Sequence, residues 1–221
     1  MDNERNIDAE VIKGKGFYLG FKRVCGFISG ILGTIVLSPL LLFLCIWILI
    51  DDGGPVLFKQ KRVGKNKKHF MIYKFRTMKK STPHDTPTHL LKDPEQYITR
   101  SGKFMRKTSL DELPQLFNII KGDIDVVGPR PALWNQYDLI EERDKFGANA
   151  IRPGLTGWAQ ANGRDTLSIE KKAELDGYYV KNMGVGLDIK SIFLTVKNIG
   201  GEGVVEGGPD NAKKDGEETK S

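Results

Sequence analysis

The hydropathy pattern begins with a long apolar run near the N-terminus. From Val24 to Ile50 the sequence contains no charged side chain. A helix over this run would reach about 40 Å, more than the roughly 30 Å of a bilayer's hydrocarbon core. The run is also longer than the ~7–15-residue apolar region of a cleavable signal, and it ends in Asp51-Asp52 instead of small residues. The pattern therefore predicts a permanent membrane element.

Ser38 and Pro39 interrupt the middle of this run. A proline inside a helix removes one backbone hydrogen bond and costs about 3 kcal/mol. The apolar side chains favour insertion by up to about 5–10 kcal/mol, so insertion outweighs the break. The hydroxyls of Ser38 and Thr34 are predicted to bond the carbonyls that Pro39 leaves free. We expect a membrane helix that is kinked at Ser38-Pro39.

Cationic residues flank the apolar run on both sides. They are Lys13, Lys15, Lys22 and Arg23 before it, and Lys59, Lys61, Arg62, Lys65, Lys67 and Lys68 after it. Because positive flanks are retained in the cytoplasm, this distribution favours a re-entrant hairpin whose two ends face the same side. A single spanning helix with a proline kink is the alternative, and the spacing alone leaves it open.

Short strand patterns follow the membrane run. Residues 56–60 and 70–75 are predicted strands on either side of a lysine-rich turn, residues 61–68. The lysines either rest on anionic headgroups or are only solvated. Residues 81–88, with two prolines, are a predicted loop.

Residues 109–122 carry helix signals at both ends. Ser109 with Glu112 matches a capping box, and Gly122 suits a helix end. Helical spacing also predicts an apolar stripe, formed by Leu113, Leu116, Phe117 and Ile120. Asp111 and Glu112 would then lie at a helix N-terminus, where free N–H groups attract phosphate.

The rest of the chain combines stiff and irregular segments. Residues 123–127 are predicted to be extended and lead to Arg130, which two prolines hold on a stiff backbone. The glycine-rich residues 147–164 are a predicted shaped loop. Residues 187–199 have helical spacing, and this helix either packs on the core or lies on a membrane surface.

Charge is distributed unevenly along the chain. The net charge is +6, but residues 200–221 hold six acids and three lysines, so residues 1–199 carry +6 minus −3, which is +9. A basic body attracts phosphate, yet no helix-turn-helix, zinc finger or aromatic stacking run supports nucleic-acid binding. The spacings of the three histidines and of Cys25 and Cys45 predict neither a metal site nor a disulfide.

The acidic pair Asp111-Glu112 lies near several cations in the sequence. A carboxylate that approaches a diphosphate meets like charge, at a cost of about 4 kcal/mol per pair at ~4 Å and an effective dielectric of ~20. Arginines, and a Mg²⁺ shared between carboxylates and phosphates, can cancel this repulsion. Helix capping by a solvated acid pair is the alternative that spacing leaves open.

Six blocks, in order, resemble the bacterial sugar transferase family, the monotopic phosphoglycosyl transferases, in a small form with a minimal catalytic domain. They are the membrane run with Ser38-Pro39, YKFRTM at 73–78, RKTSLDELPQL at 106–116, VGPRP at 127–131, RPGLTGWAQANGR at 152–164 and ELDGYYV at 174–180. The similarity covers residues 17–199, and six linked blocks are far more specific than any one of them.

The resemblance implies an α+β fold: a re-entrant membrane helix hairpin, a small cytoplasmic mixed domain and interfacial amphipathic helices. The expected segments are an N-terminal tail (1–16), the membrane helix (17–52), the catalytic domain (53–199) and a disordered acidic tail (200–221). The expected location is the bacterial inner (cytoplasmic) membrane, with the catalytic domain on the cytoplasmic face.

The resemblance also implies a reaction. A sugar 1-phosphate moves from a UDP-sugar to polyprenyl (undecaprenyl) phosphate through a covalent aspartyl-phosphosugar intermediate, UMP is released, and membrane glycan assembly begins. Anionic lipids are expected partners, nucleic acid is not, and a homodimer is left open. The alternative function is a non-catalytic membrane scaffold for glycan-assembly enzymes.

Carried onto this sequence, the resemblance assigns the catalytic roles. Asp111 is the nucleophile, and Glu112 is the second catalytic acid and the ligand of a Mg²⁺ cofactor. Phosphate or nucleotide contacts are expected from a set of cations, namely Arg106, Arg130, Lys74, Arg76, Arg152 and Arg164. Asp188 either supports the metal site or caps a helix.

Overall fold

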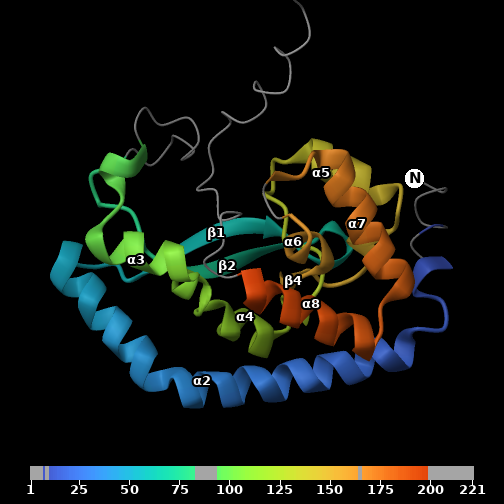
Figure 1. The fold of residues 1–221 in the computed structure, drawn as a ribbon, viewed down its shortest axis with the longest axis horizontal. Helices are drawn as coiled ribbons and strands as arrows, with labels where there is room; N and C mark the ends of the chain where they lie inside the picture. Colours follow the sequence, from blue (N-terminus) through green and yellow to red (C-terminus); the bar gives the residue numbers. More distant parts are fainter. Residues whose placement is uncertain (1–6, 8–9, 83–93, 164–165, 199–221) are drawn as a thin grey trace, which may run out of the picture.

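The structure, a computed structural model, describes residues 7, 10–82, 94–163 and 166–198 (Figure 1). Its helices are α2 (Gly16–Asp52), α3 (Arg100–Thr108), α4 (Gln115–Lys121), α5 (Tyr137–Asp144), α6 (Trp158–Ala161), α7 (Ile169–Asn182) and α8 (Val185–Asn198). Its strands are β1 (Leu57–Val63), β2 (His69–Phe75), β3 (Asp125–Val127) and β4 (Gly154–Thr156). Single 3₁₀ turns are η1 (Lys65–Lys67), η3 (Pro94–Tyr97), η4 (Leu110–Glu112) and η5 (Ala148–Ala150). The mixture of helix and sheet agrees with the predicted α+β class, whereas most of the loop 81–88, Arg164 and the tail 200–221 lie outside the described residues.

Helix α2 runs along one side of the whole molecule, beneath α4 and α8 in the view of Figure 1. Within the described part of the chain it is the one helix long and apolar enough to cross a membrane. Many of its apolar side chains are exposed, among them Val24, Phe27, Ile28, Ile31, Leu32, Ile35, Val36, Leu42, Phe43, Ile46, Leu49 and Ile50. An apolar surface of this size is unfavourable in water, so the exposed face of α2 fits lipid.

Helix α2 is bent in its second half, which rises toward α3 (Figure 1). Pro39 lies inside the helix and cannot donate to the carbonyl of Ile35, four residues earlier. The Ser38 hydroxyl donates to that carbonyl at 2.7 Å, as predicted. The prediction for Thr34 is wrong, because its hydroxyl donates to Gly30 O at 2.8 Å instead. The helix therefore continues across the proline with its freed carbonyl satisfied.

Helix α4 packs on the middle of α2, where glycines leave space for its side chains. A Cβ added to Gly30 would lie 2.9 Å from Ile120 Cγ1, and one added to Gly33 would lie 3.4 Å from Leu116 Cδ2. The Arg23 guanidinium donates to the carbonyls of Ile119 and Ile120, each at 2.7 Å. The predicted apolar stripe thus packs in part on the membrane helix, although Phe117 is exposed.

The segment before α4 differs from the prediction. Ser109 has φ 56°, in the left-handed region; it ends α3, and its side chain makes no capping hydrogen bond to the turn that follows. Leu110–Glu112 then forms the 3₁₀ turn η4, and Pro114 occupies the N-cap of α4. The capping-box prediction is wrong because the Glu112 side chain is held by cations from other segments. The predicted end is confirmed, since Gly122 (φ 90°) donates to the carbonyls of Asn118 and Ile119.

The described residues form two sheets of two strands each. Strands β1 and β2 form an antiparallel hairpin with Leu57 opposite Phe75 and Val63 opposite His69, which confirms and lengthens the predicted strands. Strand β3 pairs in parallel with β4. The prediction of an irregular loop over residues 147–164 therefore missed a short strand and the one-turn helix α6, since the partner strand lies far away in sequence.

One hydrophobic core cluster joins β3, the segment around η5 and α7. Its buried members are Val127, Ala148, Ile151, Tyr179, Val180 and Met183. Helix α8 is confirmed close to its predicted bounds; Ser191 is fully buried on one face, whereas Ile189, Phe193 and Val196 are exposed on the other. The helix therefore uses one face for the core and keeps a second, apolar face outside.

The beginning of α2 is fixed to α7 and α8 by a polar network. The Asp188 carboxylate accepts hydrogen bonds from the hydroxyls of Tyr18 and Tyr179, each at 2.6 Å. Lys22, whose side chain is 8% exposed, lies 3.1 Å from Asp188 Oδ2 and also contacts the Tyr179 hydroxyl. This buried ion pair connects the membrane helix to the C-terminal part of the fold.

Replacing Gly30 with leucine should destabilise the protein, because the new side chain must enter space that Ile120 occupies. Overpacking of this kind costs about 1–3 kcal/mol. We expect a melting temperature several degrees lower in thermal unfolding of the detergent-solubilised protein. Gly20→Leu is the matched control, since a Cβ there meets nothing within 4 Å. Equal melting temperatures for the two variants would contradict the packing.

Candidate active site

The adjacent acids Asp111 and Glu112 lie in η4, between α3 and α4. The left-handed backbone at Ser109 turns the chain sharply out of α3, so both carboxylates point into the domain instead of along a helix. Both side chains are 14% exposed. The pair is therefore mostly withdrawn from water. At such a site charge interactions are stronger than at an open surface.

Two cations hold the Glu112 carboxylate. Lys74 Nζ, on β2, lies 2.8 Å from Glu112 Oε1, and Arg130 Nη2 lies 3.2 Å from the same oxygen. Burial alone would raise the pKa of Glu112, but Arg130 and Lys74 outweigh it and hold this pKa well below its usual range. Glu112 is thus firmly ionised and already engaged.

Asp111 has a looser environment. Its nearest ion pair is with Lys74, whose Nζ lies 3.9 Å from Asp111 Oδ2. Burial and the neighbouring Glu112 raise the pKa of Asp111 above its ordinary value, although Lys74, Arg106 and Arg130 act in the opposite direction. Of the two acids, Asp111 is therefore the more basic and the less tightly held.

Arg106 and Arg130 reach this acidic pair from separate segments. Arg106 lies in the last turn of α3, where its Nε donates to Thr77 Oγ1 at 2.9 Å. Arg130 follows β3, and the backbone around it is fixed by hydrogen bonds from Gly128 N to Thr156 O and from Gly154 N to Pro129 O. The predicted residues Lys74, Arg106 and Arg130 are thus brought together around Asp111 and Glu112.

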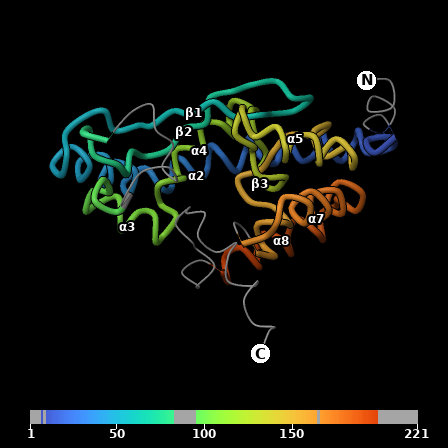
Figure 2. The backbone as a smooth tube through the Cα atoms, turned by 90° about the horizontal axis from the view of Figure 1, so that it is seen from above, coloured from blue at the N-terminus to red at the C-terminus, as the bar shows by residue number. Residues whose placement is uncertain are grey.

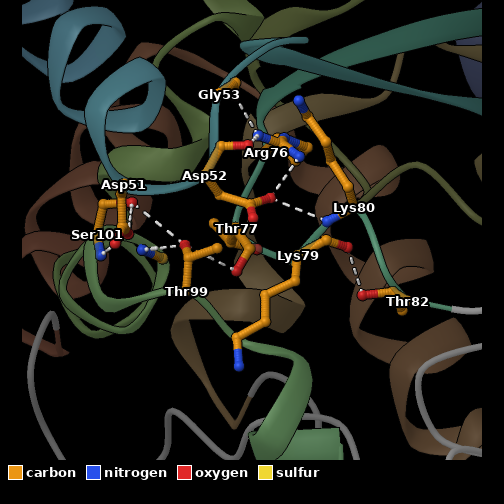
Figure 3. A network of polar contacts seen from close by, with 11 residues as sticks. Asp51, Asp52, Gly53, Arg76, Thr77, Lys79, Lys80, Thr82, Thr99 and Ser101 are labelled. Carbon is orange, nitrogen blue, oxygen red and sulfur yellow. Dashed lines mark hydrogen bonds and ion pairs between the residues drawn. The ribbon is translucent and has the colours of Figure 1, made fainter.

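The other predicted cations have different surroundings. Arg76 is held by the Asp52 carboxylate at 2.8 Å and by the backbone carbonyls of Asp52 and Gly53 (Figure 3). Arg152 Nε donates to Gly122 O at 3.0 Å, at the end of α4. Both contacts join segments of the fold, and neither brings the guanidinium to Asp111. Arg164 lies outside the described residues.

Asp188 makes its hydrogen bonds and its ion pair with residues outside the acidic pair. Its carboxylate accepts hydrogen bonds from the hydroxyls of Tyr18 and Tyr179 and forms an ion pair with Lys22, as described above. It lies in the first turn of α8, but its carboxylate is engaged by side chains of α2 and α7. The contacts give Asp188 a role in joining helices.

Metal binding at the acidic pair would require further oxygen ligands from a substrate's phosphates. Among the described residues, no group of three or more His, Cys, Asp or Glu could hold an ion. Asp111 and Glu112 supply only carboxylate oxygens, which are the ligands that Mg²⁺ prefers, and Mg²⁺ is commonly held by one or two carboxylates together with substrate phosphates. The donor set therefore fits Mg²⁺ shared with a diphosphate.

Sequence reasoning missed the residues that support the site. Asp51 and Asp52 marked only the end of the apolar run, yet Asp51 Oδ2 accepts from Ser101 N and Oγ at 2.8 and 2.7 Å, and Asp52 binds Arg76 (Figure 3). Thr77 received no role, although it contacts Arg106. Two acids directly after an apolar helix were the available signal, because their partners had to come from elsewhere in the chain.

The chain is similar to known sugar transferases. A family model described as bacterial sugar transferase matches residues 17–201. The uncharacterized sugar transferase EpsL of Bacillus subtilis (strain 168) is 45% identical over 162 residues, which cover 73% of this chain and 78% of that protein. An Aeromonas hydrophila protein named UDP-N-acetylgalactosamine-undecaprenyl-phosphate N-acetylgalactosaminephosphotransferase is 37% identical over 188 residues, 82% of this chain and 44% of that protein.

A third relative has a different sugar in its name. The UDP-glucose:undecaprenyl-phosphate glucose-1-phosphate transferase of Escherichia coli (strain K12) is 37% identical over 183 residues, 79% of this chain and 39% of that protein. This chain thus spans less than half the length of the Aeromonas and Escherichia relatives, and most of the length of EpsL.

Two isosteric variants should change stability in opposite directions. Glu112→Gln removes the counter-charge of Lys74 and Arg130 and should lower the free energy of unfolding by about 3 kcal/mol. Asp111→Asn should raise it, because the variant removes a carboxylate that burial disfavours in its charged form. Urea unfolding at pH 7 in EDTA measures both.

The pH dependence of these stability differences tests whether they arise from the charges of Glu112 and Asp111. The stabilisation that the ionised Glu112 adds to the free energy of unfolding is fully present above the unfolded pKa of about 4.3. It is lost as the pH falls from there through the lower folded pKa. The destabilisation caused by burying the ionised Asp111 is fully present above its raised folded pKa. It disappears below the unfolded pKa of about 3.9. The Glu112→Gln difference from wild type should therefore shrink as the pH falls below about 4.3, whereas the Asp111→Asn difference should shrink as the pH falls toward about 3.9 and be absent below it. Differences independent of pH would contradict the assignment.

Proposed function

The chain belongs to the bacterial sugar transferase family, and we propose that it transfers a sugar 1-phosphate from a UDP-sugar to polyprenyl phosphate. The observation that carries this proposal is the pair Asp111-Glu112 held among Lys74, Arg106 and Arg130. A diphosphate donor and a phosphate acceptor both bring negative charge to one place, and these cations offset it. The names of the relatives, which include undecaprenyl-phosphate sugar-phosphate transferases, support the same reaction.

Asp111 is the nucleophile in this proposal. Two cations lie 2.8 and 3.2 Å from Glu112 Oε1, and they lower the basicity of this carboxylate. Asp111 has a raised pKa and only a 3.9 Å contact to Lys74, so its oxygens are more basic and freer to move. The two adjacent acids thereby take different roles, one that reacts and one that holds charge.

The reaction has two displacement steps. First, an Asp111 carboxylate oxygen bonds to the sugar-bearing phosphorus, and the bond from that phosphorus to the bridging oxygen breaks, so UMP leaves with the bond's electrons. Second, an oxygen of polyprenyl phosphate attacks the same phosphorus and the aspartyl ester bond breaks. The carboxylate is restored, and the product is a polyprenyl diphosphate sugar. This is ping-pong covalent catalysis.

Glu112 would bind Mg²⁺ together with the donor phosphates. Its lowered pKa keeps it ionised, and an ionised carboxylate is the form that binds the cation. When bound, Mg²⁺ would neutralise charge on the diphosphate. Arg106 and Arg130 would hold phosphate oxygens, with Lys74 between the two acids.

The membrane arrangement follows from the length and bend of α2. A straight helix of 37 residues would extend about 55 Å, well beyond the ~30 Å of a bilayer core. We propose that the bent helix is re-entrant, with both ends on the cytoplasmic face of the bacterial inner membrane. The apolar face of α8 would lie in the interface, and exposed Lys65 and Lys68 would meet anionic headgroups. The acidic pair would then lie near the acceptor's phosphate.

Asp111→Asn should abolish turnover and leave membrane association unchanged, because the amide cannot form the ester. Purified protein with UDP-sugars, undecaprenyl phosphate and Mg²⁺ is assayed for UMP release. Mass spectrometry of wild type quenched with donor alone should find a sugar phosphate on the peptide that contains Asp111. The rate should fall by at least about 10³-fold.

Asp138→Asn is the control, because Asp138 is an exposed aspartate of α5. It should keep wild-type activity. Wild-type turnover by Asp111→Asn would remove the nucleophile assignment. If the wild-type protein released no UMP with any donor, a non-catalytic scaffold would be favoured.

Cysteine labelling tests the re-entrant topology. In a background without Cys25 and Cys45, cysteines at exposed Lys13 and Lys65 flank the membrane helix. Because both ends are proposed to be cytoplasmic, an impermeant thiol reagent should label neither position in intact cells and both after lysis. Labelling of one position from outside would show a spanning helix instead.

A further inference from the structure

Thr77 is a buried residue at the junction of β2, α3 and the end of α2 (Figure 3). It follows Phe75, the last residue of β2, by two positions. Its side-chain oxygen and its main-chain oxygen have different partners. The hydroxyl oxygen accepts from Arg106 Nε at 2.9 Å, whereas the backbone carbonyl accepts from Thr99 N at 3.0 Å and Thr99 Oγ1 at 3.3 Å. The residue therefore holds α3 with its main chain and Arg106 with its side chain.

The start of α3 is itself fixed on Thr77. Thr99 is the N-cap of α3, and its side chain accepts from Gly102 N at 2.9 Å. A Cβ on Gly102 would lie 2.2 Å from Thr77 O, so only glycine allows this approach. Helix α3 is rigid over the single turn from Gly102 to Arg106, which places Arg106 at a defined distance from Thr77.

The membrane helix is connected to the same junction. Asp51 at the end of α2 accepts from Ser101 N and Ser101 Oγ, and Ser101 Oγ lies 3.2 Å from Thr99 Oγ1 (Figure 3). A continuous set of hydrogen bonds thus runs from Asp51 through Ser101, Thr99 and Thr77 to Arg106. Ser101, Thr99 and Thr77 are only 1%, 5% and 8% exposed, so water competes little for these bonds.

We propose that Thr77 is a positioning residue for the reaction, which acts through Arg106: its hydroxyl fixes the guanidinium plane so that Arg106 faces Asp111 and the donor phosphate. The inference rests on the proposed function. An arginine side chain loses considerable rotamer freedom when it is ordered, and a hydrogen bond at Nε orders it before the substrate binds. The bond uses one edge of the guanidinium and thereby sets the direction of the other, which is the arrangement a phosphate clamp requires.

The side chain and main chain of Thr77 can be separated by mutation. Thr77→Val keeps the shape and the carbonyl that holds α3, and it removes only the acceptor for Arg106. Thr77→Ser restores that acceptor. Ser191→Ala is the control, because Ser191 is also buried and its hydroxyl donates to Leu187 O within α8 instead of contacting an active-site cation.

The experiment is a double-mutant cycle of Thr77→Val with Arg106→Gln. Full-length protein in detergent is assayed for kcat and KM in UMP release, and for UDP affinity by calorimetry, after melting temperatures are recorded. Hydrogen bonds to charged groups have energies that correspond to roughly 10-fold or more in kcat/KM. We expect Thr77→Val to lower kcat/KM about 10-fold, and Thr77→Ser and Ser191→Ala to stay within about twofold of wild type.

The Arg106→Gln background gives the decisive result. If Thr77 acts through Arg106, Thr77→Val causes no further loss there. The same fold loss in both backgrounds, or an equal loss in Ser191→Ala, would overturn the proposal. The UDP affinities of the four proteins in the cycle should show the same non-additivity. This measurement separates the inference from the proposed function. A wild-type protein that releases no UMP would refute the transfer reaction, whereas the role of Thr77 would still be tested by UDP binding. An unchanged kcat/KM and UDP affinity in Thr77→Val would also overturn it.

Discussion

The repulsion between two adjacent carboxylates is the constraint around which this domain is organised. Asp111 and Glu112 are mostly buried, and cations from three separate segments compensate them: Lys74 from β2, Arg106 from α3 and Arg130 from the segment after β3. None of these segments is close to the others along the chain, so the compensation exists only when the domain is folded. The site therefore depends on tertiary structure to a greater degree than the compact sequence around Asp111 indicates.

Helix α2 is a structural support as well as a membrane element. Its beginning is joined to α7 and α8 by Lys22, its middle receives α4 against Gly30, and its end binds the start of α3 and the end of β2 through Asp51 and Asp52 (Figures 1 and 2). The segment that carries the acidic pair lies between the second and third of these contacts. Its position relative to the lipid is thus set by packing on the helix, instead of by a flexible linker.

Local patterns in the sequence identified the elements whose causes are local. The apolar run, the β1–β2 hairpin, the Gly122 helix end and the helix after residue 185 all follow from periodicity or from glycine and proline chemistry. The capping box failed because Ser109 and Glu112 match a local motif, whereas distant cations decide where the Glu112 side chain lies. Strand β4 was missed for a similar reason, since its pairing partner β3 is not visible in its own sequence. For the site, the sequence indicated a set of cations near the acids, but it did not distinguish Lys74, which binds Glu112, from Arg76, whose partner Asp52 ends the membrane helix.

The ion pair between Lys22 and Asp188 has a consequence for biosynthesis. A ribosome makes the chain from the N-terminus, so α2 is complete long before Asp188, 166 residues later, has been synthesised. Until then the Lys22 ammonium has no carboxylate partner at its final position, and it must remain hydrated or bind a lipid phosphate. Closure of the fold at this end of the helix is thus a late event, and translation has to pass α8 before the domain is fastened to its anchor.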